Sequence, residues 1–106
     1  MIKMTNHLQQ ERADRYAFIV TTIGLGTVVH TTHYTSHKYG DNIKLDITST
    51  GVAMVYNPQG VLITLYILRI GEARKYFDGE LPMVLEAVIK KNMRLHLPEK
   101  QNQVKY

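Results

Sequence analysis

The sequence predicts an α+β domain in which an N-terminal helix packs on a four-stranded antiparallel sheet and one or two C-terminal helices follow. Three observations predict it. Apolar residues recur at helical spacing over 5–23, four short β-type runs lie between residues 27 and 68, and helical patterns return after residue 72. Because only short turns separate the four runs, the strands are expected to form an antiparallel meander.

The first predicted element is a helix over 5–23. Thr5 and Asn6 are suitable N-cap residues, and glutamine and glutamate follow in the first turn. Gly24 and Gly26 end the helical pattern. The better of its apolar faces consists of Ala13, Tyr16, Ala17, Val20 and Ile23.

The strands are predicted at 27–34, 43–48, 52–56 and 61–68. In the second strand, apolar residues alternate with polar ones, which is typical of a strand with one buried face. We expect helix 5–23 to cover the apolar face, which takes Ile43, Leu45, Ile47, Val61, Ile63, Leu65 and Ile67. The opposite face is expected to hold Lys44, Asp46, Thr48, Thr64 and Tyr66, together with Leu62 and Leu68.

Two helices are predicted after the sheet, at 72–77 and 81–95. Pro82 fits the first turn of the second helix, and Pro98 is expected to end it. Residues 1–98 therefore read as a single α+β domain. Residues 99–106 read as a flexible basic tail.

Composition excludes several classes of protein. The chain has 106 residues, 44% of them hydrophobic and 21% charged, which suits one globular domain rather than a disordered chain. The absence of cysteine excludes a disulfide framework, a thiolate zinc site and a cysteine nucleophile. No cofactor is expected, since no glycine-rich nucleotide motif is present. No secretory signal or membrane-spanning stretch is visible, so the expected location is cytoplasmic, with no membrane partner.

The charge distribution points to a polyanionic partner. The net charge is +4, and the excess lies entirely in the last twenty residues, because residues 1–86 carry eight basic and eight acidic side chains. A basic segment on a neutral domain is consistent with nucleic acid, here RNA rather than DNA, although a solvated helix face has the same pattern. The candidate contact residues are Lys38, Arg74, Lys75, Lys90, Lys91 and Arg94.

Three histidines, His30, His33 and His37, lie within eight residues. A metal site is not expected, because His30 and His33 point to opposite faces of one strand and no carboxylate lies nearby in sequence. Histidine can act as base and acid at neutral pH, which suits attack of a ribose 2′-hydroxyl on its own phosphate. The candidate catalytic set takes the two strand histidines for proton transfer, a lysine for phosphate charge and two polar residues for orientation: His30, His33, Lys44, Thr64 and Tyr66.

The order of elements resembles that of the small metal-independent ribonucleases, a group that includes barnase, the RelE-type toxins, the colicin D and colicin E5 domains and the EndoU nucleases. Residues 5–70 carry the resemblance. The Thr64-x-Tyr66 end of the last strand resembles the close of the EndoU branch, as does a set of two histidines with Lys44 or Lys38. This resemblance implies an RNA-cleaving domain. The histidines here are closer together than in that branch.

The sequence-based hypothesis is therefore an RNA-binding domain that acts as a metal-independent endoribonuclease, either toxin-like or an accessory protein of a mobile element. Two alternatives stay open. One is a non-enzymatic nucleic-acid-binding regulatory module, with Tyr34, Tyr39 or Tyr66 stacking on bases. The other is a small protein-interaction or inhibitor module that docks through a strand edge, and a homodimer is compatible with such a sheet.

Overall fold

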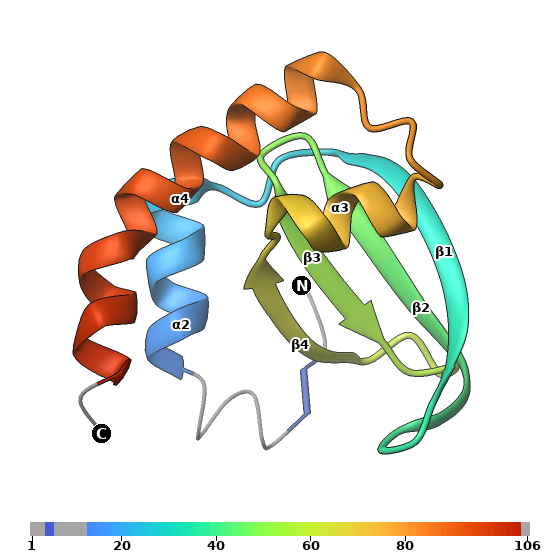
Figure 1. The fold of residues 1–106 in the computed structure, drawn as a ribbon. Helices are drawn as coiled ribbons and strands as arrows, with labels where there is room; N and C mark the ends of the chain where they lie inside the picture. Colours follow the sequence, from blue (N-terminus) through green and yellow to red (C-terminus); the bar gives the residue numbers. More distant parts are fainter. Residues whose placement is uncertain (1–3, 6–12, 105–106) are drawn as a thin grey trace.

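The computed structural model describes residues 4–5 and 13–104, with side chains described as far as Leu95. A helix, a sheet and two further helices follow one another along the chain (Figure 1). The elements are α2 (Ala13–Phe18), the π-helix η1 (Ile19–Ile23), β1 (Val28–Ser36), β2 (Gly40–Thr48), β3 (Val52–Tyr56), β4 (Leu62–Ile67), α3 (Ile70–Tyr76) and α4 (Met83–Val104). The predicted α+β class is confirmed.

The four strands form one sheet in the order β1-β2-β3-β4, and each neighbouring pair is antiparallel. This is the predicted meander. The outer edge of β4 is covered in part by the N-terminal residues, because Met4 forms a parallel bridge with Leu62 and the Thr5 amide donates to the Leu62 carbonyl at 3.0 Å. β1 forms the opposite edge of the sheet (Figure 1).

Helices pack on both faces of the sheet. One face, which we call the α3 face, presents Ile43, Leu45 and Ile47 of β2 to buried residues of α3 and α4. The other, the α2 face, presents residues such as Met54 and Leu65 to Ile19 of the π-helix. Each face thus has its own apolar core, and β3 is buried on both sides.

The predicted assignment of the N-terminal helix to the Ile43 face is wrong. Alternation within β2 was predicted correctly, but β3 reads apolar on both faces, so the sequence pattern does not show which helix covers which face. A bulge in β4 also breaks its alternation: Thr64 pairs with Val55 and Leu62 with Tyr56. Ile63 therefore packs in the α3-face core, whereas Leu65 packs on the α2 face.

The described part of the N-terminal helix, residues 13–23, is helical as predicted, and the segment 6–12 lies outside the described residues. Its buried stripe differs from the predicted one, because Ile19 is fully buried while Val20 is 40% exposed. The Gly24 amide donates to the Ile19 carbonyl five residues earlier, at 2.6 Å. This wider π turn changes the helical spacing near the end and leaves Tyr16, Ile19 and Ile23 against the α2-face core.

The C-terminal helices lie close to their predicted places. α3 begins two residues earlier than expected, and α4 continues to Val104, so the expectation that Pro98 ends it is wrong. Proline removes one helical hydrogen bond, yet the backbone on both sides keeps helical geometry. Asn92 of α4 is buried and donates through Nδ2 to the Thr50 carbonyl at 2.6 Å, which fixes α4 to the β2–β3 turn. No described helix is long and apolar enough to cross a membrane.

Candidate functional site

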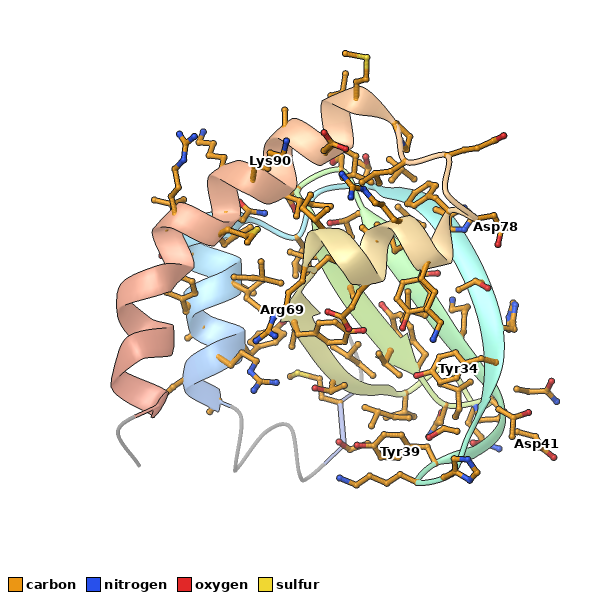
Figure 2. The ribbon with its side chains drawn as sticks, viewed as in Figure 1. Tyr34, Tyr39, Asp41, Arg69, Asp78 and Lys90 are labelled. Atoms are coloured by element: carbon orange, nitrogen blue, oxygen red, sulfur yellow. The ribbon has the colours of Figure 1, made fainter. Side chains whose placement is uncertain are left out.

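A hollow of about 490 Å³ lies on the α3 face between β1 and the end of α3. Figure 2 shows Asp78 beside the upper part of β1 and Tyr34 further along the same strand. The lining residues are aromatic, hydroxyl-bearing and charged: His30, Thr31, Thr32, Tyr34, Lys75, Tyr76, Phe77, Asp78 and Glu80.

The strand side of the hollow follows from the period of two in β1. His30, Thr32 and Tyr34 pair with Ile47, Leu45 and Ile43 of β2, whose side chains are buried in the α3-face core. Residues directly opposite each other in an antiparallel pair point to the same face. The three β1 side chains therefore extend the α3 face outward beyond its apolar core.

The other side of the hollow is the turn that ends α3. Asp78 and Gly79 both adopt positive φ, 53° and 85°, and the Gly79 amide donates to the Arg74 carbonyl at 2.8 Å. Such left-handed residues reverse the chain after a helix, and aspartate and glycine tolerate them. The reversal places the carboxylates of Asp78 and Glu80 at the rim, with Lys75 from the last turn of α3.

Two contacts hold the His30 ring in the hollow. Its ring stacks on Phe77, with centroids 4.3 Å apart and planes at 29°. Its Nε2 lies 3.1 Å from the Tyr76 carbonyl oxygen. Since a carbonyl only accepts hydrogen bonds, Nε2 carries the proton, and in the neutral ring Nδ1 is then the free acceptor. His30 can therefore take a proton at Nδ1.

Three tyrosines line or support this site. Burial raises the pKa of Tyr66 far above its ordinary value, and a side-chain hydrogen bond to Tyr76 raises it further. Burial also raises the pKa of Tyr34, with smaller contributions from Tyr76 and Tyr39. Both phenols thus stay protonated at neutral pH and can donate hydrogen bonds.

His33 and Lys44 lie on the α2 face, opposite the hollow. They form a directly opposed pair in the β1–β2 ladder, and His33 is exposed. The Lys44 ammonium lies 3.6 Å from the Asp46 carboxylate and 4.6 Å from the centre of the Tyr56 ring. The structure therefore does not bring His33 or Lys44 together with His30.

The Asp46 carboxylate on that face is buried and accepts a hydrogen bond from the Thr31 hydroxyl at 2.7 Å. Its charge also contributes to a raised pKa of Tyr56, after the larger effect of burial. A buried carboxylate requires such partners. The contact with Lys44 therefore balances the charge of Asp46, a buried carboxylate with a structural role.

Thr64 and Tyr66 lie on the α3 face, but on β4. Three strand spacings separate β4 from β1, about 14 Å in a sheet with the usual interstrand distance. Tyr66 reaches the hollow only through its bond to Tyr76, and Thr64 does not line it. Of the five candidate catalytic residues, the structure thus places only His30 in the hollow.

The candidate nucleic-acid contacts are spread over three elements. Lys75 lines the hollow, and Lys38 lies in the β1–β2 turn, 5.4 Å from the Tyr39 ring centre. Arg74 and Lys90 share the Glu86 carboxylate, at 3.5 and 3.3 Å, and the hydrogen bond from Lys90 is the main cause that lowers the pKa of Glu86. Lys91 and Arg94 are exposed on α4.

Sequence reasoning did not identify six of the lining residues: Thr31, Thr32, Tyr76, Phe77, Asp78 and Glu80. Thr32 could have been found from its spacing, two residues after His30 on the same face. The last four join the site only because α3 ends beside β1, which no local pattern indicates. Within residues 4–5 and 13–104, no group of three or more histidine or carboxylate residues could hold a metal ion.

Comparisons with protein-family models, curated proteins and solved structures found no match to this chain.

Proposed function

We propose that this chain binds single-stranded RNA in the hollow beside β1 and cleaves it without a metal, with His30 as the general base. The observation that carries the proposal is the fixed ring of His30, whose Nε2 lies 3.1 Å from the Tyr76 carbonyl oxygen. In the neutral tautomer that donates from Nε2, Nδ1 holds the lone pair that accepts a proton. The resemblance noted from the sequence points to the same chemistry.

The hollow has the parts that a nucleotide requires. Phe77, Tyr34 and Tyr76 offer aromatic surface, and single-stranded bases stack on such side chains. Lys75 supplies a positive charge for a phosphate on one side of the rim. Asp78 and Glu80 repel phosphate but accept hydrogen bonds from base amino groups, which orients the base toward them.

The reaction needs one base and one acid. Nδ1 of His30 takes the proton of a ribose 2′-hydroxyl, and that oxygen attacks the neighbouring phosphorus. The bond between phosphorus and the 5′-oxygen of the next nucleotide breaks, which leaves a 2′,3′-cyclic phosphate. The departing oxygen takes a proton from a water molecule in the hollow, and Lys75 stabilises the phosphate charge in the transition state.

The test is incubation of the pure protein with labelled single-stranded RNA in EDTA, beside the variants His30→Ala and His33→Ala. His33 is the matched control, because it lies three residues away on the same strand but on the opposite face. Loss of a general base lowers such rates about 10²–10⁴-fold, so His30→Ala should abolish cleavage while His33→Ala retains it. Melting temperatures of both variants show whether each is folded.

A second substrate separates chemistry from binding. An oligonucleotide with 2′-deoxyribose at every position has no internal nucleophile, so it should bind and remain uncut. Cleavage of that strand, or equal activity in His30→Ala, would overturn the proposed mechanism. Salt-sensitive binding with no cleavage of either strand would favour the non-enzymatic regulatory module. Absence of both binding and cleavage would favour a protein partner.

A further inference from the structure

The outer edge of β1 is the one long strand edge left open in the described part of the chain. β1 has nine residues and pairs on one side with β2, whereas Met4 and Thr5 cover part of the β4 edge. In Figure 1, β1 forms the rim of the sheet, with no described element outside it. The free amide and carbonyl groups of such an edge are a template for another strand.

Two features that often protect a strand edge, proline and charged side chains, are absent from β1, whereas pairing irregularities, a third such feature, lie only near its two ends. Its sequence, VVHTTHYTS, contains no proline and no lysine, arginine, aspartate or glutamate. Val28 and Val29 are 54% and 52% exposed. Register shifts lie between Val28 and His30 and between Tyr34 and Ser36. They leave one regular run, His30–Tyr34, so a strand that pairs here can adopt only a few registers.

We propose that this edge pairs with a second copy of the chain, antiparallel and centred on Thr32. That register uses the whole regular run, because residues 30–34 of one copy face residues 34–30 of the other. Thr32 lies opposite the partner's Thr32, and His30 lies opposite the partner's Tyr34. Thr31 lies opposite the partner's His33. The threonine pair and the histidine–tyrosine pairs are favourable across strands, and no like charges meet in any of the five pairs.

The choice of a second copy rests on this self-complementarity and on closure. A two-fold axis uses the same edge on both copies, so the assembly is closed once two chains have paired. The other sheet edge is partly covered by Met4 and Thr5, which disfavours further addition. Because His30, Thr32 and Tyr34 share the α3 face, the pairing sets the two hollows side by side on one continuous face. The dimer does not depend on the proposed RNA chemistry.

A covalent trap tests the register. Five residue pairs bury less than the roughly 1,200 Å² of stable interfaces, so the dimer is expected to depend on concentration. The chain has no cysteine, which makes a single introduced thiol specific. Thr32→Cys should form a disulfide-linked dimer about tenfold faster than Asp41→Cys, because only residue 32 faces its own copy at strand-pair distance. Asp41 is exposed at the start of β2.

Charged substitutions at the proposed two-fold axis test the dimer without a covalent bond. In sedimentation equilibrium, wild-type protein should dimerise, whereas Thr32→Lys and Thr32→Glu should each remain monomeric because two like charges meet at the axis. A mixture of the two variants should recover the dimer. Melting temperatures show that each variant is folded. A wild-type monomer up to the solubility limit, equal trapping of both cysteine variants, or no recovery in the mixture would overturn the proposal.

Discussion

His30 and His33 lie three residues apart on β1, and the molecule treats them differently. His30 is half-buried on the α3 face, stacked on Phe77 and bonded to the Tyr76 carbonyl. His33 is exposed on the α2 face, opposite Lys44 of β2. Both histidines belong to the same strand, so the contacts of each depend on the face to which it points and on the helix that ends beside that face.

The same contrast holds for the two faces as wholes. On the α2 face, the polar and charged groups near β1 contact one another, because Thr31 and Lys44 both lie against the buried Asp46 carboxylate. On the α3 face, the polar groups of the hollow surround an open space of about 490 Å³. The first arrangement is typical of structural support and the second of a binding site. Four sets of variants test how the two faces differ.

The strongest test concerns how α4 is fixed over the α3 face. Gly51 has φ +81°, and a Cβ there would lie 2.8 Å from Asn92 Nδ2 and 3.3 Å from Ile89 Cγ1. Gly51→Ala should therefore lower the free energy of unfolding by about 2–4 kcal/mol, through backbone strain together with overpacking. Gly60 has nearly the same φ, +82°, but open space around it. Gly60→Ala should lower the free energy of unfolding by the backbone strain alone, about 1–2 kcal/mol. Urea denaturation measures both variants. Equal losses would contradict the packing role of Gly51.

Neighbouring threonines on opposite faces provide the next test. Thr31→Val removes the hydroxyl that donates to buried Asp46, and should lower the free energy of unfolding by about 1–3 kcal/mol. Thr32 lies opposite Leu45 on the α3 face, and Thr32→Val should change this free energy by less than about 0.5 kcal/mol. Thermal melts followed by circular dichroism measure both. Greater destabilisation by Thr32→Val would show that the two faces are misassigned.

Two lysines test the same distinction through RNA. Lys75→Ala should weaken RNA binding about tenfold and reduce the salt slope of binding by about one, because a phosphate contact is lost. Lys44→Ala should leave RNA binding unchanged and lower the melting temperature, because Asp46 loses its nearby cation. Fluorescence anisotropy at several salt concentrations measures the first effect. Weaker binding with Lys44→Ala would place RNA on the α2 face instead.

The smallest effect is expected for the exposed ion pairs that Glu86 of α4 makes with Arg74 and Lys90. Hydrogen bonding from Lys90 is the main cause that lowers the pKa of Glu86 in the folded protein. A carboxylate with a lowered pKa stabilises the fold above its unfolded value, about 4.3, and this contribution is lost as the pH falls through the folded value. Glu86→Gln should therefore lower the melting temperature slightly at pH 7, and the difference should shrink as the pH falls below about 4.3. A difference that is the same at pH 7 and at pH 3 would contradict a charge effect.

Local sequence patterns are enough to predict the elements and their order. Alternation in residues 43–48, the turns at Gly51 and Gly60, and helical spacing near both ends are local patterns, so they predicted the meander and its flanking helices. The sequence also separated His30 from His33, because an odd spacing in a strand places two side chains on opposite faces.

The helix that covers each face, and the residues that meet in the hollow, follow from tertiary packing and from no local pattern. β3 is apolar on both sides and a bulge at Ile63 changes the alternation of β4, so face assignment depends on packing between segments far apart in sequence. The same packing removed Lys44 and Thr64 from the neighbourhood of His30 and brought Lys75 and Phe77 to it. Local periodicity fixes the direction of a side chain relative to its own strand, whereas a site also requires the end of α3 to lie beside β1.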